Sequence, residues 1–223
     1  MNKKRLIGVL CFLIACVVAF SQNNSFTPEW AVGINGGATF SKISFSTGFR
    51  IPQELLLQSS EGITVRYISE NHFGIQGELN YSLRGWKEIT DSVHLNRQTR
   101  SLAYLELPLM THIYFGMGKR VNFIFNLGPQ FSYFLHEKNL ETEINTVNAS
   151  SEYYNMKIQH KFDYGLKVTM GIEFKTGVGS FVLDGRYYFG LSDIFNNTKG
   201  DLFQASSHKV IGLSLTYLYN IKR

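Results

Sequence analysis

The stretch KFDYGLKVTMGIEFK, residues 161 to 175, decides the fold. Every second residue from Phe162 to Phe174 is apolar or aromatic, and the residues between them are polar or glycine. Successive side chains of a β-strand point to opposite faces, so this pattern predicts one long strand with an apolar face and a polar face. Its length exceeds the roughly 5–6 residues usual in soluble proteins and suffices for a membrane-spanning strand, which needs roughly 9–11.

Alternation by itself leaves open which face of such a strand lies inside a barrel. A soluble, lipocalin-like barrel would place the apolar side chains inside. Two features favour a membrane barrel with a polar interior. The polar face is rich in glycine, which suits a crowded and narrow interior, and the apolar face is bulky and aromatic in strand after strand.

The same alternation recurs along the rest of the chain. It predicts eight strands, at residues 30–41, 61–70, 73–87, 101–116, 121–136, 161–175, 180–193 and 208–220. Long connections at 42–60, 88–100, 137–160 and 194–207 alternate with short turns, as external loops and periplasmic turns do in bacterial outer-membrane barrels. The sequence therefore predicts an all-β fold, an eight-stranded antiparallel transmembrane β-barrel with up-and-down meander topology. Pro108 has no backbone N–H to donate to a neighbouring strand, so we expect irregular strand pairing near it.

The first residues have the features of a secretory signal peptide. A basic start at residues 3–5 precedes an uncharged apolar run at residues 6–20, and small residues stand where a signal peptidase cuts. We therefore expect a signal peptide at 1–21 and an outer-membrane β-barrel domain at 22–223. A retained membrane anchor and a lipoprotein-type cleavage at Cys16 are the alternatives.

Cysteine content and charge limit the possible functions. Both cysteines, Cys11 and Cys16, lie in the expected signal segment, so neither disulfide nor thiol chemistry is expected of the remaining chain. Without that segment, 19 basic residues face 17 acidic ones, and the formal net charge falls from +5 to +2. This balance gives no indication of nucleic-acid binding.

Ionisable residues of both signs lie on the polar faces of the predicted strands. The expected polar network of the barrel interior consists of Arg66, Glu78, Arg84, Glu106, His112, Asp163, Lys167, Glu173, Asp184 and Arg186. An eight-stranded barrel is just wide enough for side chains to fill it, and buried charges require partners. We therefore expect these residues to pair and plug the barrel, with a pore lining or a proton path as the alternative.

Aromatic residues fall near the expected ends of the strands, where the interfacial girdles of membrane barrels lie. Trp30 is expected at the periplasmic interface and Trp86 at the outer interface. The full set assigned to the girdles is Trp30, Trp86, Tyr114, Phe115, Tyr133, Phe174, Phe181, Tyr187 and Tyr219.

Five blocks resemble the PorT-like outer-membrane β-barrel proteins of Bacteroidetes, a porin-like family of Gram-negative bacteria. The blocks are YLELPLMTHIYF (104–115), FNLGPQFSYFL (125–135), FDYGLKVTMGIEF (162–174), DGRYYFGLSDI (184–194) and IGLSLTYLYN (211–220). The resemblance covers the whole chain after the expected signal peptide. It implies an eight-stranded barrel in the cell outer membrane, and some members of the family take part in type IX secretion. Fold alone does not give an activity.

The C-terminus departs from the family pattern. Such barrels often end on an aromatic residue, whereas here Tyr219 is followed by residues 220–223. Gly212, Leu215 and Tyr217 still fit the glycine-and-apolar signal expected to be bound by the barrel-assembly machinery. That machinery is therefore an expected partner.

No catalytic residue, cofactor or metal site is expected. The sequence has no HExxH and no GxSxG motif. His94, His136, His160 and His208 fall near the expected external loops, where a rim enzyme acting on lipid or peptide is the alternative to simple solvation. Asp91-Ser92-Val93 resembles the short O-glycosylation motif of Bacteroidetes.

These patterns predict a structural or interaction protein. We expect a monomeric barrel, surrounded by outer-membrane lipid, whose external loops bind a secretion or surface protein. The alternative is a narrow porin-like channel for small solutes.

Overall fold

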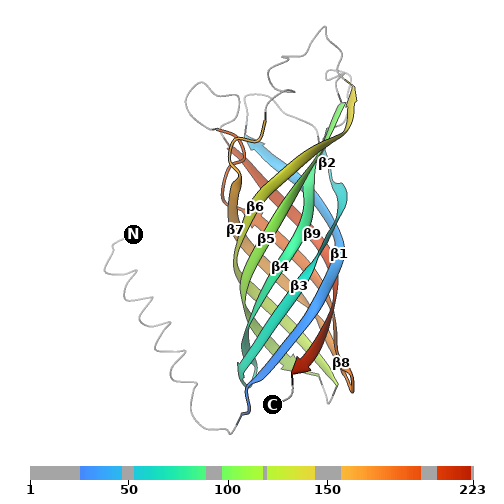
Figure 1. Cartoon of the computed structure of the whole chain (residues 1–223), viewed down its shortest axis with the longest axis vertical. Helices are drawn as coiled ribbons and strands as arrows, with labels where there is room; N and C mark the ends of the chain where they lie inside the picture. The colour runs from blue at the N-terminus through green and yellow to red at the C-terminus, as the bar shows by residue number, and fades with distance from the viewer. Residues whose placement is uncertain are drawn as a thin grey trace, which may run out of the picture.

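The computed structural model describes residues 26–46, 53–88, 97–117, 120–143, 157–196 and 205–221. Its strands are β1 (Glu29–Ser46), β2 (Gln53–Glu54), β3 (Leu56–Glu70), β4 (Phe73–Glu88), β5 (Arg97–Gly116), β6 (Val121–Glu143), β7 (Phe162–Thr176), β8 (Gly179–Gly190) and β9 (Ala205–Ile221). They form one tall barrel (Figure 1). The expected signal segment, residues 91–93 and His94 lie outside the described residues. No helix in the described ranges has the length and apolar character to cross a membrane.

Hydrogen bonding closes the sheet on itself. Each long strand pairs antiparallel with its neighbours in the chain, and β1 closes the barrel by pairing with β9 from Trp30↔Ile221 to Ser46↔Ala205. The two-residue β2 comes directly before β3 in the chain, separated from it by Leu55, and pairs with β4. The eight long strands therefore confirm the predicted up-and-down barrel.

The two ends of the barrel differ in the length of their connections. Short connections join β3 to β4, β5 to β6 and β7 to β8 at one end, which we call the short-turn end. The strand ends joined by the longer connections lie at the other end, which we call the long-loop end, and β1 begins and β9 ends on the short-turn side (Figure 1). The predicted alternation of long and short connections is confirmed.

Several strands continue further towards the long-loop end than the sequence predicted. The connection expected at 42–60 is shorter because β1 runs on to Ser46 against β9 and β3 begins at Leu56. β6 likewise passes its predicted end at residue 136 and continues to Glu143, paired with β5. The alternation of apolar residues stops before the backbone pairing does, so hydrophobic periodicity underestimates the length of these strands.

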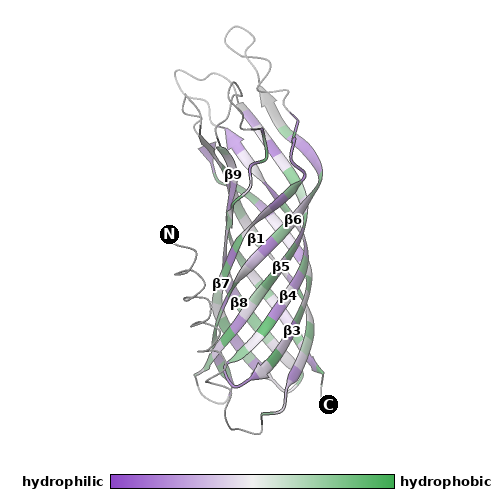
Figure 2. Cartoon of the chain, turned by 90° about the vertical axis from the view of Figure 1, so that its left-hand side faces the viewer, coloured by the Kyte–Doolittle hydropathy of each residue, from purple (hydrophilic) through white to green (hydrophobic). Residues whose placement is uncertain are grey.

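The apolar face of each strand points out of the barrel and the polar face points in. On β7, Phe162 and Met170 are 55% and 53% exposed, whereas Asp163 and Lys167 are 1% and 5% exposed. Figure 2 shows the resulting alternation of hydrophobic and hydrophilic residues along the strands. The predicted polar interior is confirmed, and the lipocalin-like arrangement with an apolar interior is wrong.

Inward-facing glycine allows adjacent strands to approach closely. A Cβ atom added at Gly171 of β7 would lie 2.1 Å from the carbonyl oxygen of Leu183 on β8. A side chain there would push the two strands apart, which is a physical reason for glycine on the crowded inner face.

The expected irregularity at Pro108 is present. The β4–β5 ladder pairs Gly77 with Leu109 and Asn80 with Glu106 but skips the positions between them. Proline cannot donate to the ladder, so this part of the wall lacks regular pairing.

Candidate functional site

The barrel interior holds all ten ionisable residues that the sequence places in the polar network. They come from β3, β4, β5, β7 and β8. The buried members are Arg66, Glu78, Arg84, Glu106, His112, Asp163, Lys167, Glu173 and Asp184, and the side chain of Arg186 is 11% exposed. Because an unpaired buried charge is costly, the pairing of these side chains decides whether the lumen is filled.

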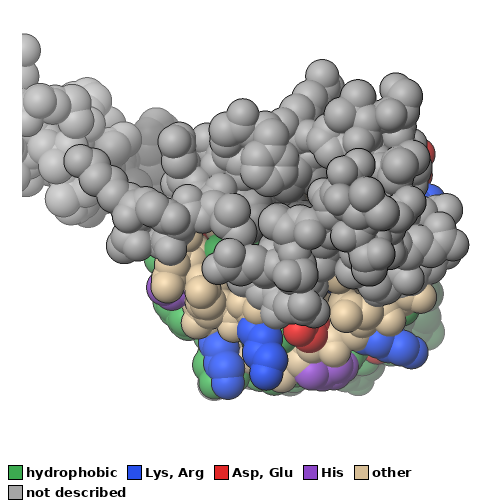
Figure 3. All heavy atoms as spheres, turned by 90° about the horizontal axis from the view of Figure 1, so that it is seen from above, with side chains coloured by type: hydrophobic (Ala, Val, Ile, Leu, Met, Phe, Trp, Pro, Cys, Tyr) green, Lys and Arg blue, Asp and Glu red, His purple; other side chains and the backbone are tan. Residues whose placement is uncertain are grey.

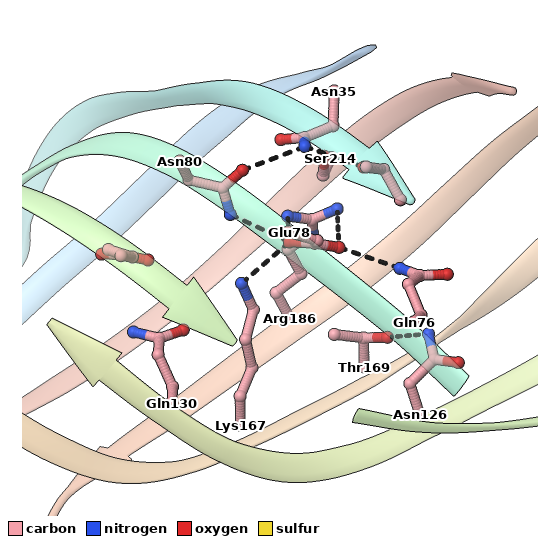
Figure 4. Close-up of polar contacts among 12 residues, drawn as sticks. Asn35, Gln76, Glu78, Asn80, Asn126, Gln130, Lys167, Thr169, Arg186 and Ser214 are labelled. Carbon is pink, nitrogen blue, oxygen red and sulfur yellow. Dashed lines mark hydrogen bonds and ion pairs between the residues drawn. The ribbon is translucent and has the colours of Figure 1, made fainter. Parts of the chain in front are cut away.

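A central cluster is organised around Glu78. Its carboxylate lies 3.3 Å from Lys167 Nζ and 3.0 Å from Arg186 Nη1. Arg186 also binds Asp184 through Nε at 2.7 Å, and the Asn80 amide donates to Glu78 at 2.9 Å. Figure 4 shows Glu78, Asn80, Lys167 and Arg186 reaching towards one another from several strands. Lys167, Arg186 and Asn80 all contact Oε2 of Glu78, and its Oε1 accepts from the Gln76 amide at 2.9 Å, so both oxygens have partners.

A second cluster lies nearer the short-turn end and joins the first. Arg66 Nη1 lies 2.8 Å from Glu173, whose other oxygen accepts from the Asn122 amide at 2.8 Å. Gln76 accepts from Arg66 Nε and donates to Glu78, both at 2.9 Å. The two clusters thus form one continuous network.

A third cluster nearer the long-loop end surrounds Arg84. Its guanidinium donates to Glu106 and Asp163, each at 2.8 Å. The same group lies 4.9 Å from the ring centroid of Tyr104 and 4.4 Å from that of Tyr188. Two carboxylates and two aromatic faces thus hold one cation across the width of the lumen.

A small cavity lies between the central cluster and the Arg84 cluster. It has a volume of about 30 Å³ and is lined in part by Arg84, Glu106, Gln130, Lys167 and Arg186. A buried water needs about 10–15 Å³, so the cavity has room for roughly two waters. A cavity of this size is too small to serve as an aqueous passage through the barrel.

Apolar side chains close the long-loop end. The buried cluster there contains Ile43, Trp86, Leu102, Tyr104, Phe134, Ile158, Ile194 and Phe195. The last three belong to the segments 157–161 and 191–196, which we call the mouth segments. His160 N–H donates to Ile194 O at 3.2 Å, and Ile194 N–H donates to Ser206 O at 3.0 Å. These bonds tie the mouth segments to each other and to the start of β9.

A smaller apolar layer closes the short-turn end. Ala31, Ile124, Val182 and Leu218 point inward from four strands and form a buried cluster against which Tyr114 packs. All five residues belong to strands. This closure is therefore part of the barrel wall, whereas the closure at the long-loop end uses chain segments that follow β6 and β8.

Two residues assigned to the aromatic girdles lie inside the barrel, which corrects the prediction. Trp86 is fully buried, and its Nε1 donates to Glu88 at 3.0 Å. Tyr114 is half-buried and packs against the apolar layer at the short-turn end. Trp86 lies two residues after inward-facing Arg84, and Tyr114 lies two residues after inward-facing His112, so each falls on the inner face of its strand. Position along the strand therefore predicts the location of these two residues better than their aromatic character does.

The other residues assigned to the girdles lie on the outer surface. Trp30, Phe115, Tyr133, Phe174, Phe181, Tyr187 and Tyr219 are 40–58% exposed. Trp30, Phe115, Phe174, Phe181 and Tyr219 stand at the short-turn ends of their strands, and Tyr133 and Tyr187 stand further towards the long-loop end.

The histidines that the structure describes do not form a common site. His112 Nδ1 lies 2.7 Å from the Asn126 amide oxygen, and His208 Nε2 lies 3.1 Å from the Tyr104 hydroxyl. His136 and His160 are exposed. Within the described ranges, no group of three or more His, Cys, Asp or Glu side chains is placed to hold a metal ion.

Sequence reasoning missed part of the Arg84 cluster. Tyr188, which donates to Asp163 at 2.8 Å, shares the parity of Asp184 and could have been assigned inward. Ser192, which also donates to Asp163, lies beyond the end of β8 at Gly190 but within the predicted strand 180–193. It shares the parity of Asp184, so alternation could have assigned it inward as well.

Substitution of Arg84 by glutamine should strongly destabilise the barrel. It would leave Glu106 and Asp163 buried without their cation, and breaking such a pair costs about 3–5 kcal/mol. The free energy of unfolding, measured by urea titration of the protein in detergent micelles, should fall by about that amount.

The matched control is Lys87→Gln. Lys87 pairs with Glu54 at 3.0 Å, but the two side chains are 29% and 54% exposed. Exposed pairs contribute about 0–1 kcal/mol. Equal effects of the two substitutions would show that the interior pairs do not determine stability.

Comparisons with known proteins agree with this architecture. The family described as outer membrane protein beta-barrel domain matches residues 20–196. No curated protein matches the sequence. Among solved structures, the chain is similar to Ail, the attachment invasion locus protein of Yersinia pestis, solved with the heparin analogue sucrose octasulfate. The identity is 16%, over 86% of this chain and 99% of that chain, with a TM-score of 0.39.

Two further solved structures are similar at the same level. Neisserial surface protein A is 12% identical over 86% of this chain and 99% of its own, with a TM-score of 0.43. Outer membrane protein W of E. coli is 12% identical over 87% and 99%, with a TM-score of 0.41. Structural similarity at this level does not support any inference about function. The family match, which spans most of a closed barrel with an apolar outer surface, shows that this chain belongs to the outer membrane protein beta-barrel domain family and lies in the cell outer membrane.

Proposed function

We propose that this protein is a closed, monomeric barrel that anchors an interaction surface outside the outer membrane, where it binds a secretion or surface protein. The quoted blocks support a PorT-like relationship, and we assign no catalytic role. Membrane lipid and the barrel-assembly machinery are the other partners that this proposal requires.

The main evidence for this proposal is the closure of the lumen. Charges of opposite sign pair across the interior, and apolar layers cover them at both ends. The cavity between the clusters holds only about 30 Å³. A hydrated solute would have to break several buried ion pairs to pass, each costly to separate. This geometry supports an anchor over a channel.

The protein should therefore give no stable open steps in planar bilayers at neutral pH. The measurement uses purified protein whose folded state is checked by a mobility shift between unboiled and boiled samples on a gel. A matched preparation of a known open porin shows that insertion was achieved. Reproducible single-channel steps from the folded protein would instead favour the narrow channel.

The β5–β6 hairpin is the described element best placed to meet a partner. β6 has 23 residues, about twice the roughly 9–11 that a tilted membrane strand needs, and the excess lies at the long-loop end. Charged and histidine side chains also lie on the described part of the rim at this end (Figure 3). Bacterial barrels place their longer loops outside the cell, so this end is the external one.

Among the described residues, one edge of the projecting part of β6 has no strand paired to it. Pairing with β7 ends at Tyr133↔Phe162, followed by one bond from Phe134 N–H to Lys161 O at 2.7 Å. Within the described ranges, residues 135–143 then pair with β5 on one side only, and residues 135–140 are all exposed. An unpaired strand edge offers main-chain donors and acceptors to an added strand. We infer that an extended segment of the partner binds there.

Site-specific photo-crosslinking tests this surface. A photoreactive amino acid at exposed Lys138 should capture another protein on intact cells, because Lys138 lies midway along the open edge. The control position is Val178, which is 69% exposed in a turn at the opposite end. The same adduct at both positions, or none at Lys138, would contradict the assignment of the interaction surface.

A further inference from the structure

The outer surface carries an apolar groove in the half of the barrel nearest the short-turn end. Its volume is about 440 Å³. The lining includes Trp30, Val65, Ile75, Gly77 and Leu109 from four neighbouring strands. Ligand sites usually measure roughly 300–1,000 Å³, so the groove is large enough for a small molecule.

The register of the sheet explains the shape of the groove. Trp30, Tyr67, Ile75 and Thr111 stand opposite one another across β1, β3, β4 and β5 and form one outward row. The next row contains Val65, Gly77 and Leu109 across β3, β4 and β5. Because Gly77 has no side chain, this row is interrupted, and the groove opens above its backbone.

The backbone gives no reason for glycine at position 77. A Cβ atom added there would meet only Leu109 Cδ2, at 3.6 Å, which is an ordinary contact. By contrast, a Cβ at inward-facing Gly37 would lie 2.1 Å from a backbone oxygen. Glycine weakens a strand interior and often marks a place where a ligand approaches the backbone.

The groove lies at the depth of lipid hydrocarbon. Gly77 is four residues from Phe73, where β4 begins at the short-turn end. At about 3.3 Å per residue and a tilt near 45°, this places Gly77 roughly 9 Å from that end of the strand. The rings of Trp30 and Tyr67, whose centroids are 4.6 Å apart, border the groove with the amphipathic side chains typical of a membrane interface.

We propose that this groove is a binding site for one acyl chain of a phospholipid from the periplasmic leaflet. The apolar lining and the depth match a hydrocarbon chain, and none of the lining side chains is charged. Bacterial barrels place short turns in the periplasm, which assigns the groove to the periplasmic leaflet. The site is independent of the proposed external interaction surface.

Native mass spectrometry of the protein with phosphatidylethanolamine and phosphatidylglycerol tests the site. The unmodified protein should keep one phospholipid at a collision energy that removes the surrounding lipid. Gly77→Leu should lose that phospholipid, because the added side chain fills the groove. Leu109→Trp should lose it as well, by filling the groove from its side wall.

The matched control is Gly185→Leu. Gly185 also lies on the outer face, a Cβ there would have its nearest neighbour at 3.8 Å, and the residue does not line the groove. This variant should keep the phospholipid, and all variants are first checked for folding by the mobility shift on unboiled gels. The proposal is overturned if the unmodified protein shows no single retained phospholipid, if Gly77→Leu and Leu109→Trp keep it, or if Gly185→Leu loses it. Retention of a species with the mass of a lipopolysaccharide in its place would also overturn it.

Discussion

The rest of the structure depends on the requirement that every backbone group inside a membrane finds a partner within the protein. Eight antiparallel ladders meet this requirement apart from the positions skipped beside Pro108, and the β1–β9 ladder removes the last edge of the membrane-spanning wall. Once the sheet is closed, the two-residue period of a strand leaves one set of side chains for lipid and the other for the lumen. Each position therefore has its environment fixed by its parity along the strand, whatever the chemistry of its side chain.

The lumen of so small a barrel is narrow, so its side chains must satisfy one another. Arg66, Glu78 and Arg84 each hold at least two polar partners drawn from other strands or neighbouring positions. This pairing ties distant parts of the chain together and at the same time fills the passage that a channel would need. Because the interior is closed, we look for function on the surfaces, namely the projecting edge of β6 and the groove above Gly77.

Much of this arrangement could be predicted from sequence because alternation is a local property. The inward position of Asp163 and the outward position of Phe162 follow from counting along one strand. Trp86 was assigned to the membrane interface because it is aromatic. Alternation along β4 places it on the inner face with Arg84, and that placement is the correct one. Ile194 and Phe195 could not be predicted in the closure of the mouth, because they follow the last residue of β8 and their burial depends on long-range contacts.

Fluorescence quenching by brominated lipids tests the central claim, the orientation of the two faces, most directly. The chain has only two tryptophans, one 43% exposed on the outer face and one fully buried inside. In brominated bilayers, the Trp86→Phe variant, which keeps Trp30, should be strongly quenched, and the Trp30→Phe variant, which keeps Trp86, should be nearly unaffected. Strong quenching of Trp86 with little effect on Trp30, or no quenching of either, would contradict a barrel with its apolar face in lipid and its charges inside.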